Sequence, residues 1–172
     1  MWQVCYTVLN FYINLIRKLV KKVSDPKSIL KKLQDLIRGE NDFVSILSNT
    51  SALLYQDLPN VNWLGFYLWQ EDEQELLVGP FQGKVACYRI KTKQGVCGTA
   101  FSRKTSIRVA NVHQFPGHIA CDPDSKSELV VPLTRKGEVI GVIDIDSAQV
   151  NRFSQEDQEL VEACAKILDP YL

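Results

Sequence analysis

The sequence lacks any hydrophobic run long enough to cross a membrane. The longest uncharged stretch near the start, residues 1–16, is broken by Gln3, Asn10 and Asn14, and it falls short of the roughly 18 apolar residues that a spanning helix needs. A secretory signal is missing as well, because the basic cluster follows the apolar part instead of preceding it. These absences predict a cytoplasmic protein without a membrane partner, in a compartment where thiols are kept reduced.

Net charge is absent too, because 20 lysines and arginines balance 20 acidic residues. The charge is nevertheless uneven, since residues 1–38 carry eight basic and only two acidic side chains. Such a segment would suit nucleic acid or an anionic membrane, but apolar residues recur between the charges at helical spacing from Val8 to Val23. We favour the solvated face of an amphipathic helix and no nucleic-acid partner. Residues 1–24 are therefore expected to be a helical extension, whose apolar stripe would pack in a homodimer.

Internal repeats and low-complexity tracts are also absent, and 172 residues with 45% hydrophobic composition suit one domain. Apolar stripes at helical spacing occur near residues 26–38, 42–54 and 154–168. Strand patterns occur near residues 61–69, 75–78, 85–90, 107–110, 128–133 and 138–146. This order of elements predicts an α+β fold over residues 25–172, with helices on one face of the sheet.

The five cysteines lack the spacing typical of a structural metal site. There is no Cys-x2-Cys pair and no His-x3-His pair, and the nearest approach to a ligand set is His113, His118 and Cys121. An odd number of cysteines in a domain that can bury a core also argues against structural disulfides. Zinc is therefore the weaker interpretation. Cys5 and Cys164 are expected to take no part in chemistry, and Cys164 lies on an apolar helical stripe.

Three cysteines in the middle of the chain have settings that suit thiol chemistry. Cys87 follows a glycine- and proline-containing turn expected at residues 79–83. Cys97 follows a glycine that would open a short helix, whose free N–H groups would stabilise a thiolate. Cys121 lies near His118 in a long irregular stretch of the kind that is usually functional or disordered. The alternative is that all three are small buried hydrophobic residues, but their polar, glycine-rich surroundings favour redox-active thiols.

Carboxylates and aromatics form two further patterns. Alternation in the last strand puts Asp144 and Asp146 on one face, and Glu128 opens the preceding strand. Carboxylates amid an apolar strand cost stability unless paired, so the cluster would hold an ammonium group or share a proton; a frayed strand end is the equal alternative. Trp63 and Tyr67 share a strand face, where they would line a small pocket or simply pack in the core.

Together these residues resemble the GAF-domain free methionine-(R)-sulfoxide reductases. The resemblance extends from about Ser28 to the C-terminus and leaves residues 1 to about 24 without a counterpart. Its blocks are VNWLGFYL (61–68), GPFQGKVAC (79–87), GVCGTA (95–100), VHQFPGHIACD (112–122), SKSELVVP (125–132) and GVIDIDS (141–147). One small departure is Val85, where the family pattern has proline.

The resemblance implies a GAF fold: a central, mostly antiparallel six-stranded sheet with helices packed on one face and a ligand cavity on the other. It implies reduction of free methionine-(R)-sulfoxide with no bound cofactor. The external reductant would be thioredoxin, supplied by NADPH and thioredoxin reductase. The rival hypothesis is a non-catalytic GAF module that binds a small ligand or senses redox state.

The resemblance also implies roles for residues. The family's redox cysteines match Cys87, Cys97 and Cys121, its pocket aromatics match Trp63 and Tyr67, and its substrate-binding carboxylates match Glu128, Asp144 and Asp146. We expect a thiolate to attack the sulfoxide sulfur and a second thiol to condense with the resulting sulfenic acid into a disulfide. We assign Cys121 as nucleophile, Cys87 as resolver, Cys97 as a second resolver and Glu128 as proton donor. The sequence does not separate Cys97 from Cys121 as the attacking thiol.

Overall fold

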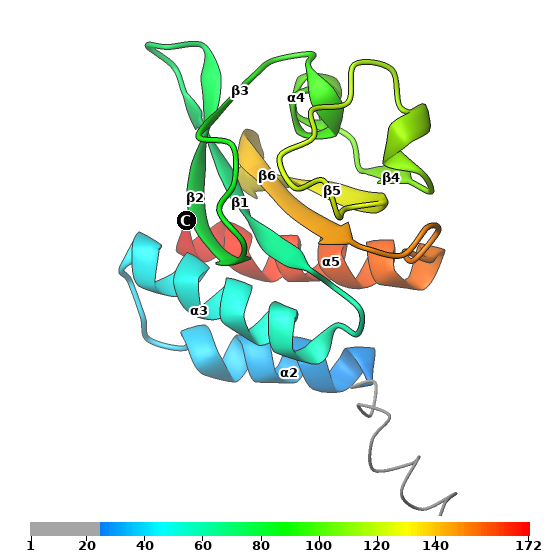
Figure 1. The fold of residues 1–172 in the computed structure, drawn as a ribbon. Coiled ribbons are helices and arrows are strands. Elements are labelled where there is room, and N and C mark those ends of the chain that lie inside the picture. The colour runs from blue at the N-terminus through cyan, green and yellow to red at the C-terminus, as the bar shows by residue number, and fades with distance from the viewer. Residues whose placement is uncertain (1–24) are drawn as a thin grey trace, which may run out of the picture.

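A six-stranded sheet separates two layers of different character (Figure 1). The structure is a computed structural model and describes residues 25–172. The helical extension predicted for residues 1–24, with Cys5 and the apolar stripe on which the homodimer was predicted, lies outside the described residues. No helix within residues 25–172 is long and apolar enough to cross a membrane.

The elements follow the predicted order. The helices are α2 (Pro26–Ile37), α3 (Phe43–Asp57), α4 (Gly95–Arg103) and α5 (Gln155–Leu168), with short 3-10 helices η1 (Val112–Gln114) and η2 (Asp169–Tyr171). The strands are β1 (Trp63–Gln70), β2 (Glu75–Gly83), β3 (Arg89–Lys91), β4 (Ile107–Val109), β5 (Ser127–Arg135) and β6 (Glu138–Ser147). The sheet order is β3-β2-β1-β6-β5-β4, and every neighbouring pair is antiparallel.

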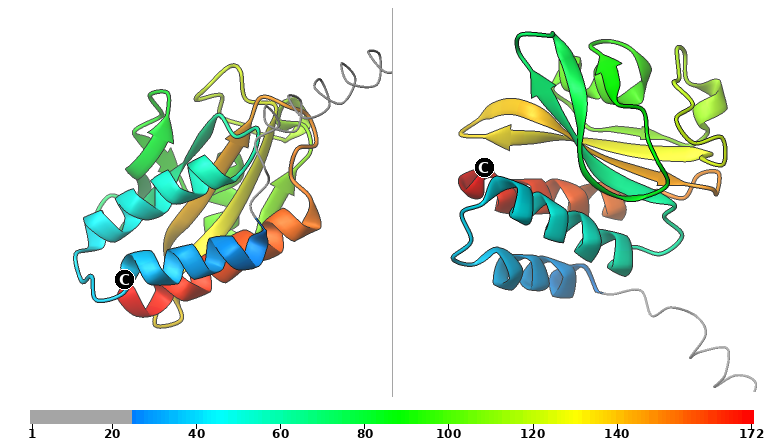
Figure 2. Two further views of the ribbon diagram at one scale, coloured as in Figure 1. Left: turned by 90° about the horizontal axis from the view of Figure 1, so that it is seen from below. Right: turned by 60° about the vertical axis from the view of Figure 1, so that its left-hand side comes forward.

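Helices α3 and α5 lie on one face of the sheet, and α2 packs against both of them on their outer side (Figure 2). Each helix carries the apolar stripe seen in the sequence, and the stripes form one cluster with Leu64, Phe66 and Ile145 of the strands. The start of α5 is fixed by a capping box, in which Ser154 and Asp157 satisfy each other's backbone N–H groups. This layer is therefore a closed apolar core.

The opposite face of the sheet carries a second cluster and the short helix α4. Alternation along β1 sends Trp63 and Tyr67 to this side, while Leu64 and Phe66 go to the helical layer. The prediction of helices on one face is thus confirmed for α2, α3 and α5, whereas α4 lies across the sheet from them. The side that α4 covers is the one that receives the candidate site residues.

The turn predicted at residues 79–83 is wrong, because β2 continues through these residues. In the pairing of β1 with β2, Gly65 is opposite Phe81 and Tyr67 is opposite Val78. Residues 79–80 of β2 therefore lie opposite a single residue of β1, at position 66. This bulge leaves room for a proline inside the strand. As a result the strand predicted at 85–90 shrinks to the three residues of β3, and residues 84–88 form an irregular link.

Candidate active site

A disulfide joins two of the predicted redox cysteines. Cys87, in the link between β2 and β3, is bonded to Cys121, which lies 34 residues further along in the stretch between η1 and β5. Their Cα atoms are 5.4 Å apart. Within residues 25–172 the free cysteines are Cys97 and Cys164, and both are buried. The fold therefore brings one pair of thiols into bonding distance from two separate loops.

A pocket lies beside this disulfide, between the sheet, α4 and the two loops. It is lined by Trp63, Tyr67, Val85, Ala86, Ile90, Gly95, Val96, Cys97, His118, Ile119, Cys121, Asp122, Ser125, Glu128, Asp144 and Asp146. Seven of the eight predicted site residues are in this lining, and Cys87 is the exception. The structure therefore assembles the predicted set around one space, with Cys121 on the pocket side of the disulfide.

The three predicted carboxylates meet at the inner end of the pocket. Glu128 of β5 lies directly opposite Asp146 of β6, and Asp144 is two residues away on the same face. Burial raises the pKa of Glu128 well above its ordinary value, and the neighbouring Asp144 and Asp146 raise it further. Burial also raises the pKa of Asp146, and it raises that of Asp144 to about 6. At neutral pH Asp144 is therefore the first of the three to ionise.

One buried acceptor in this cluster has no partner. Asp144 is 6% exposed, and its Oδ1 atom has no hydrogen-bond partner among the described residues. A buried carboxylate oxygen without a donor is costly, which makes it a natural partner for a cationic ligand such as an ammonium group. The alternative of a frayed strand end does not fit, because β6 remains paired beyond Asp146 as far as Ser147.

Aromatic rings form the wall next to the carboxylates. The rings of Trp63 and Tyr67 stack with centroids 5.9 Å apart, and Phe81 stacks on Trp63 at 5.3 Å. Gly65 is required here, because a Cβ at this position would come 2.6 Å from the Trp63 ring. The rings thus offer a flat apolar surface next to an acidic pocket end, which suits a small amphipathic ligand.

The chain matches known proteins over most of its length. The GAF domain family model matches residues 32–168. The free methionine-R-sulfoxide reductase of Escherichia coli is 51% identical over 137 residues, covering 77% of this chain and 82% of that protein. A structure of fRMsr of Staphylococcus aureus in complex with substrate has a TM-score of 0.82 and 46% identity, over 87% of this chain and 96% of that one.

This chain belongs to the GAF-domain free methionine-R-sulfoxide reductase family. A third relative agrees: the free methionine-R-sulfoxide reductase of Neisseria meningitidis, solved in complex with its substrate, has a TM-score of 0.83 and 38% identity over 86% of this chain and 90% of that one. The family and the fold predicted from the sequence are thereby confirmed. The roles predicted for individual residues stay predictions, because a shared fold does not test them.

Cys97 differs from the setting predicted for it in this reductase. Its Sγ lies 3.9 Å from Oε1 of Glu128, and the side chain is 3% exposed. Burial raises the pKa of the Cys97 thiol well above its ordinary value, and the charges of Asp144 and Glu128 add to the shift. The expectation that the start of α4 stabilises a thiolate is therefore wrong, because desolvation and two acids outweigh the helix N-terminus.

Metal ligands are available only in part. The predicted set of His113, His118 and Cys121 lacks a free thiolate here, because the sulfur of Cys121 is bonded to Cys87. Ligand atoms of Cys97, Glu128 and Asp144 all lie within 4.8 Å of one another and would suit a cation. In a family named for a substrate with a free ammonium group, these carboxylates suit that group as well as they suit a metal.

The two loops that carry the disulfide are fixed by hydrogen bonds that the sequence analysis did not predict. Trp63 donates from Nε1 to the backbone oxygen of Lys84 at 3.1 Å, and the Tyr67 hydroxyl donates to the backbone oxygen of Cys87 at 3.0 Å. The aromatic wall of the pocket thus also anchors the segment that bears Cys87. The sequence gives no signal for these bonds, because their acceptors are backbone atoms.

Asp122 performs the same task for the other loop. Its Oδ1 accepts from the backbone N–H of Asp124 at 3.0 Å and from Lys84 Nζ at 3.3 Å, and its Oδ2 accepts from Asn62 Nδ2 at 3.1 Å. The backbone bond, together with Lys84 and Asn62, holds the pKa of this nearly buried carboxyl below its ordinary value. The Asp-Pro-Asp sequence directly after Cys121 was the available signal, since it is typical of an Asx turn.

Proposed function

We propose that this protein reduces free methionine-R-sulfoxide to methionine, with Cys121 as the attacking thiol and Cys87 as the resolving thiol. The observation that carries the proposal is the Cys87–Cys121 disulfide at the edge of a pocket with an acidic end and an aromatic wall. Relatives with 38–51% identity are named for this reaction. The arrangement provides a thiol pair, a site for an ammonium group and an apolar surface for an S-methyl group.

Substrate recognition rests on the acidic end of the pocket. Asp144 ionises with a pKa of about 6 and offers its unpartnered Oδ1 to the substrate ammonium, with Asp146 beside it. Trp63 would cover the S-methyl group. A methionine sulfoxide residue within a protein lacks the free ammonium and would leave these buried carboxylates unpaired, so the pocket would reject it.

The chemistry needs one proton donor and two thiols. The Cys121 thiolate attacks the sulfoxide sulfur while Glu128, kept protonated by its raised pKa, donates a proton to the oxygen. The oxygen passes to the cysteine, so methionine leaves and Cys121 becomes a sulfenic acid. The Cys87 thiol then attacks this sulfur, water leaves, and the disulfide forms. A neutral Glu128 suits the first step, because a charged one would repel the attacking thiolate.

Two observations favour Cys121 over Cys97 as the attacking thiol. Cys121 lines the pocket and is already partnered with Cys87 in a disulfide. Cys97 lines the pocket as well, but its raised pKa keeps it a neutral thiol at pH 7, and a thiol is a poor nucleophile. The role of second resolver for Cys97 remains open in this proposal.

The test is turnover of free methionine-R-sulfoxide by the purified protein with thioredoxin, thioredoxin reductase and NADPH. We expect activity in the wild type, none for the S-epimer and none for Cys121→Ser. Cys164→Ser is the matched control, because that cysteine is fully buried in the helical layer. Wild-type turnover no higher than that of Cys121→Ser would refute the enzymatic function. Tight binding without loss of thiols would favour the sensor hypothesis instead.

A single-turnover assay decides between the two candidate attackers. We expect reduced Cys97→Ser to release methionine in full yield and Cys121→Ser to release none. The reverse result would make Cys97 the nucleophile. Counting free thiols before and after the substrate adds a check, since the wild type should lose two.

Three further proposals concern the source of electrons, the cellular compartment and the oligomeric state. We propose that no cofactor is bound and that electrons arrive from thioredoxin, which suits a reducing compartment such as the cytoplasm. We also propose a homodimer, on the apolar pattern of residues 8–23. A monomeric mass for the full chain by light scattering would rule the homodimer out.

A further inference from the structure

The two sulfurs of the disulfide face different surroundings. Cys121 lines the pocket, whereas Cys87 does not. Both residues are half-buried, so neither sulfur is wholly enclosed by its own chain. A protein-sized reductant cannot enter a pocket walled by Trp63 and Tyr67 and must approach from solvent. Cys87 is the half of the disulfide that lies outside the pocket lining.

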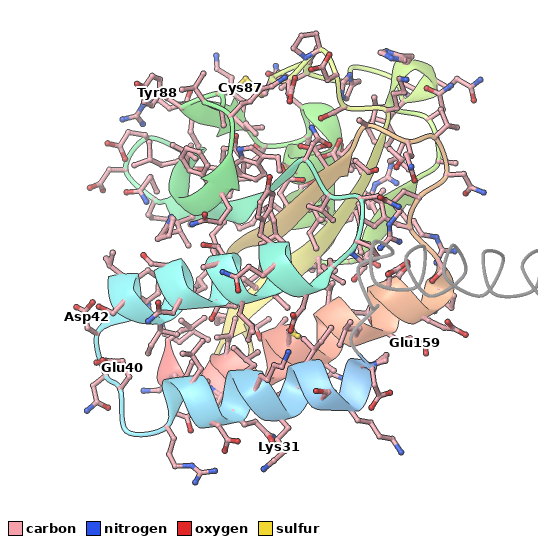
Figure 3. The ribbon with its side chains drawn as sticks, turned by 60° about the horizontal axis from the view of Figure 1, so that its bottom comes forward. Lys31, Glu40, Asp42, Cys87, Tyr88 and Glu159 are labelled. Carbon is pink, nitrogen blue, oxygen red and sulfur yellow. A yellow bond between two sulfur atoms is a disulfide. The ribbon has the colours of Figure 1, made fainter. Side chains whose placement is uncertain are left out.

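Exposed apolar side chains flank Cys87. Within residues 25–172 six large hydrophobic side chains are exposed, namely Leu36, Val44, Val85, Tyr88, Val150 and Tyr171. Two of these six stand within two residues of Cys87: Val85 is 87% exposed and Tyr88 is 79% exposed. Figure 3 shows Cys87 and Tyr88 together at the outer margin of the molecule. Val85 also lines the pocket, so Tyr88 is the exposed hydrophobic side chain that adjoins Cys87 outside the pocket lining.

The backbone beneath this surface is held in place. The backbone oxygen of Tyr88 accepts from the N–H of Val78 at 2.9 Å, and that of Cys87 accepts from the Tyr67 hydroxyl. The next strand, β3, is an edge of the sheet, so no further strand of residues 25–172 covers this side. The Tyr88 ring is thus presented on a fixed backbone at an open edge, which lowers the entropic cost of docking against it.

We infer that the dithiol reductant docks on the Tyr88 side of the sheet edge and attacks the sulfur of Cys87. This inference rests on the proposed function, which requires an external dithiol of the thioredoxin type. The reductant's thiolate forms a new S–S bond to Cys87 and the Cys87–Cys121 bond breaks, with its electron pair leaving on Cys121. The reductant's second thiol then displaces Cys87. One protein disulfide becomes two thiols and one reductant dithiol becomes a disulfide.

This direction of attack has a consequence for the next cycle. The thiolate released first is that of Cys121, which faces the pocket and is the proposed nucleophile. Attack on Cys121 would instead require the reductant to reach a sulfur on the pocket side, next to the substrate site. Docking at Tyr88 keeps the reductant outside the pocket while it regenerates the thiolate within.

The first test compares two reductants on the full chain. We expect Tyr88→Ser to lower kcat/KM for thioredoxin at least about fivefold, while turnover supported by the small dithiol dithiothreitol stays within twofold of wild type. Tyr88→Phe should retain the thioredoxin rate, because it keeps the apolar ring. Tyr171→Ser is the matched control: it makes the same change at an exposed tyrosine of η2 in the helical layer and should alter neither rate.

Each other outcome of this comparison overturns the docking surface. Equal losses with both reductants, or no loss with either, would show that thioredoxin does not use the Tyr88 ring. A change of molecular mass in Tyr88→Ser, measured by light scattering, would make this surface a contact between two copies. Failure of the wild type with both reductants would instead count against the proposed function.

The second test identifies the sulfur that is attacked. A thioredoxin variant with serine in place of its second cysteine is mixed with the oxidised protein, and the trapped mixed disulfide is located by peptide mass spectrometry. We expect the bond at Cys87. A bond at Cys121 would overturn the inference whatever the effect of Tyr88→Ser, so this test does not depend on that variant.

Discussion

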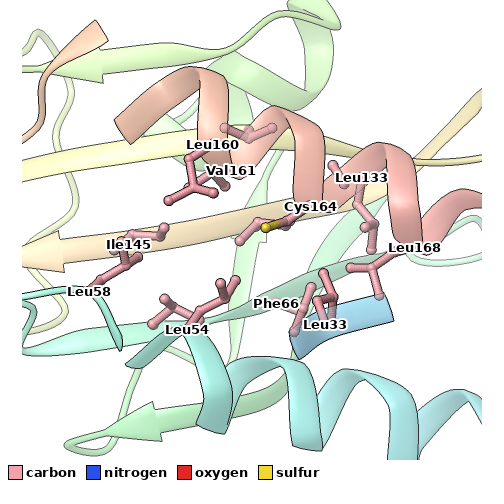
Figure 4. Packing of buried hydrophobic residues seen from close by; sticks show 14 of the residues in the cluster. Leu33, Leu54, Leu58, Phe66, Leu133, Ile145, Leu160, Val161, Cys164 and Leu168 are labelled. Carbon is pink, nitrogen blue, oxygen red and sulfur yellow. The ribbon is translucent and has the colours of Figure 1, made fainter. Parts of the chain in front are cut away.

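The two faces of the sheet use the same strands for opposite purposes. Along β6, Ile143 and Ile145 enter the helical layer, whereas Asp144 and Asp146 point into the pocket. Around Ile145 the packing is wholly apolar, with Leu54, Phe66 and Cys164 nearby (Figure 4). On the pocket face, three carboxyls have raised pKa values, and Oδ1 of Asp144 has no hydrogen-bond partner among residues 25–172. The helical face stabilises the fold, and the pocket face gives up stability for a binding site.

The two buried free cysteines sharpen this comparison. Burial alone raises the pKa of Cys164 to about 12. The pKa of Cys97 is raised by burial and, in addition, by Asp144 and Glu128. Both remain thiols at neutral pH, one because its surroundings are apolar and the other because they are acidic as well. This difference favours the half-buried pair in the loops, Cys87 and Cys121, for the proposed attack and first disulfide.

The largest effect should follow a cavity in the helical layer. Leu54 of α3 is fully buried, so Leu54→Ala should lower the free energy of unfolding by about 2–5 kcal/mol. Chemical denaturation measures this loss. The kcat/KM of the fraction that remains folded should stay within twofold of wild type, because the pocket lies across the sheet. A comparable loss of activity per folded molecule would show that the two faces are not independent.

Asp144→Asn, a change on the pocket face, should raise stability, and by less than Leu54→Ala lowers it. The pKa of Asp144 is about 6 in the folded chain and 3.8 ordinarily, so the folded state binds this proton more tightly. Stability is therefore unaffected below about pH 4 and is lost as the pH rises toward 6, and ionisation then costs up to about 3 kcal/mol at pH 7. Asp144→Asn removes this cost and should add about 1–3 kcal/mol at pH 7, but nothing at pH 4.

Asp144→Asn should be less active than the wild type, although it should be more stable. Asn cannot supply the negative charge for the substrate ammonium, so kcat/KM should fall about 100-fold, mainly through KM. Steady-state kinetics and thermal unfolding on one preparation measure both quantities. The matched control is Asp124→Asn, an exposed carboxylate near the disulfide that does not line the pocket. A variant that lost both activity and stability would indicate that Asp144 is structural.

The pH dependence of the wild type should show the same carboxyl. Below a pH of about 6 Asp144 becomes protonated, so kcat/KM should fall tenfold per pH unit, because the ammonium loses its partner. Acid pH also favours the protonated form of Glu128, whose pKa is raised mainly by burial, so a fall in rate at acid pH does not come from loss of the proton donor. The measurement is kcat/KM from pH 4.5 to 7.5. Formation of the attacking thiolate also falls with decreasing pH and does so in both proteins, so Asp144→Asn should lose only the additional fall below pH 6. Survival of that additional fall in the variant would assign the titration to another group.

Much of this division could be predicted from the sequence, because it follows from alternation. Period two along β1 and β6 was enough to place Trp63 with Tyr67 and Asp144 with Asp146. The pairing of β1 with β6, which puts Trp63 opposite Asp146, brings both pairs to one face. Alternation does not predict how deeply each side chain is buried, and burial decides whether the pocket carboxyls and the Cys97 thiol are protonated. Gly95 correctly predicted the short helix that contains Cys97, but the helix N-terminus suggested a thiolate, and burial together with the nearby Asp144 and Glu128 reverses that expectation.

The loops were the least predictable part of the site. Glycine and proline at residues 79–83 indicated a turn, yet these residues extend β2, because a bulge accommodates the proline. The disulfide joins two loops that are 34 residues apart, and the bonds that hold them end on backbone atoms or on Asp122. No periodicity encodes such contacts, since they depend on how the chain closes in three dimensions.

The smallest effect should come from one of those bonds. Tyr67 belongs to the pocket wall, and its hydroxyl donates to the backbone oxygen of Cys87 at 3.0 Å. Tyr67→Phe keeps the ring and removes this bond, which is worth about 0.5–1.5 kcal/mol. The segment bearing Cys87 should then be positioned less often for attack on the sulfenic acid. We expect disulfide formation to slow by about 3–10-fold while the first release of methionine keeps its rate.

Rapid-quench single turnover separates these two steps, with methionine and free thiols measured on the same samples. Tyr55→Phe, a change on α3 in the helical layer, is the control and should affect neither rate. Equal slowing of both steps would assign the Tyr67 hydroxyl to substrate binding. Slowing of the second step alone would show that the pocket face does two tasks with one side chain: its ring lines the substrate site, and its hydroxyl positions the resolving cysteine.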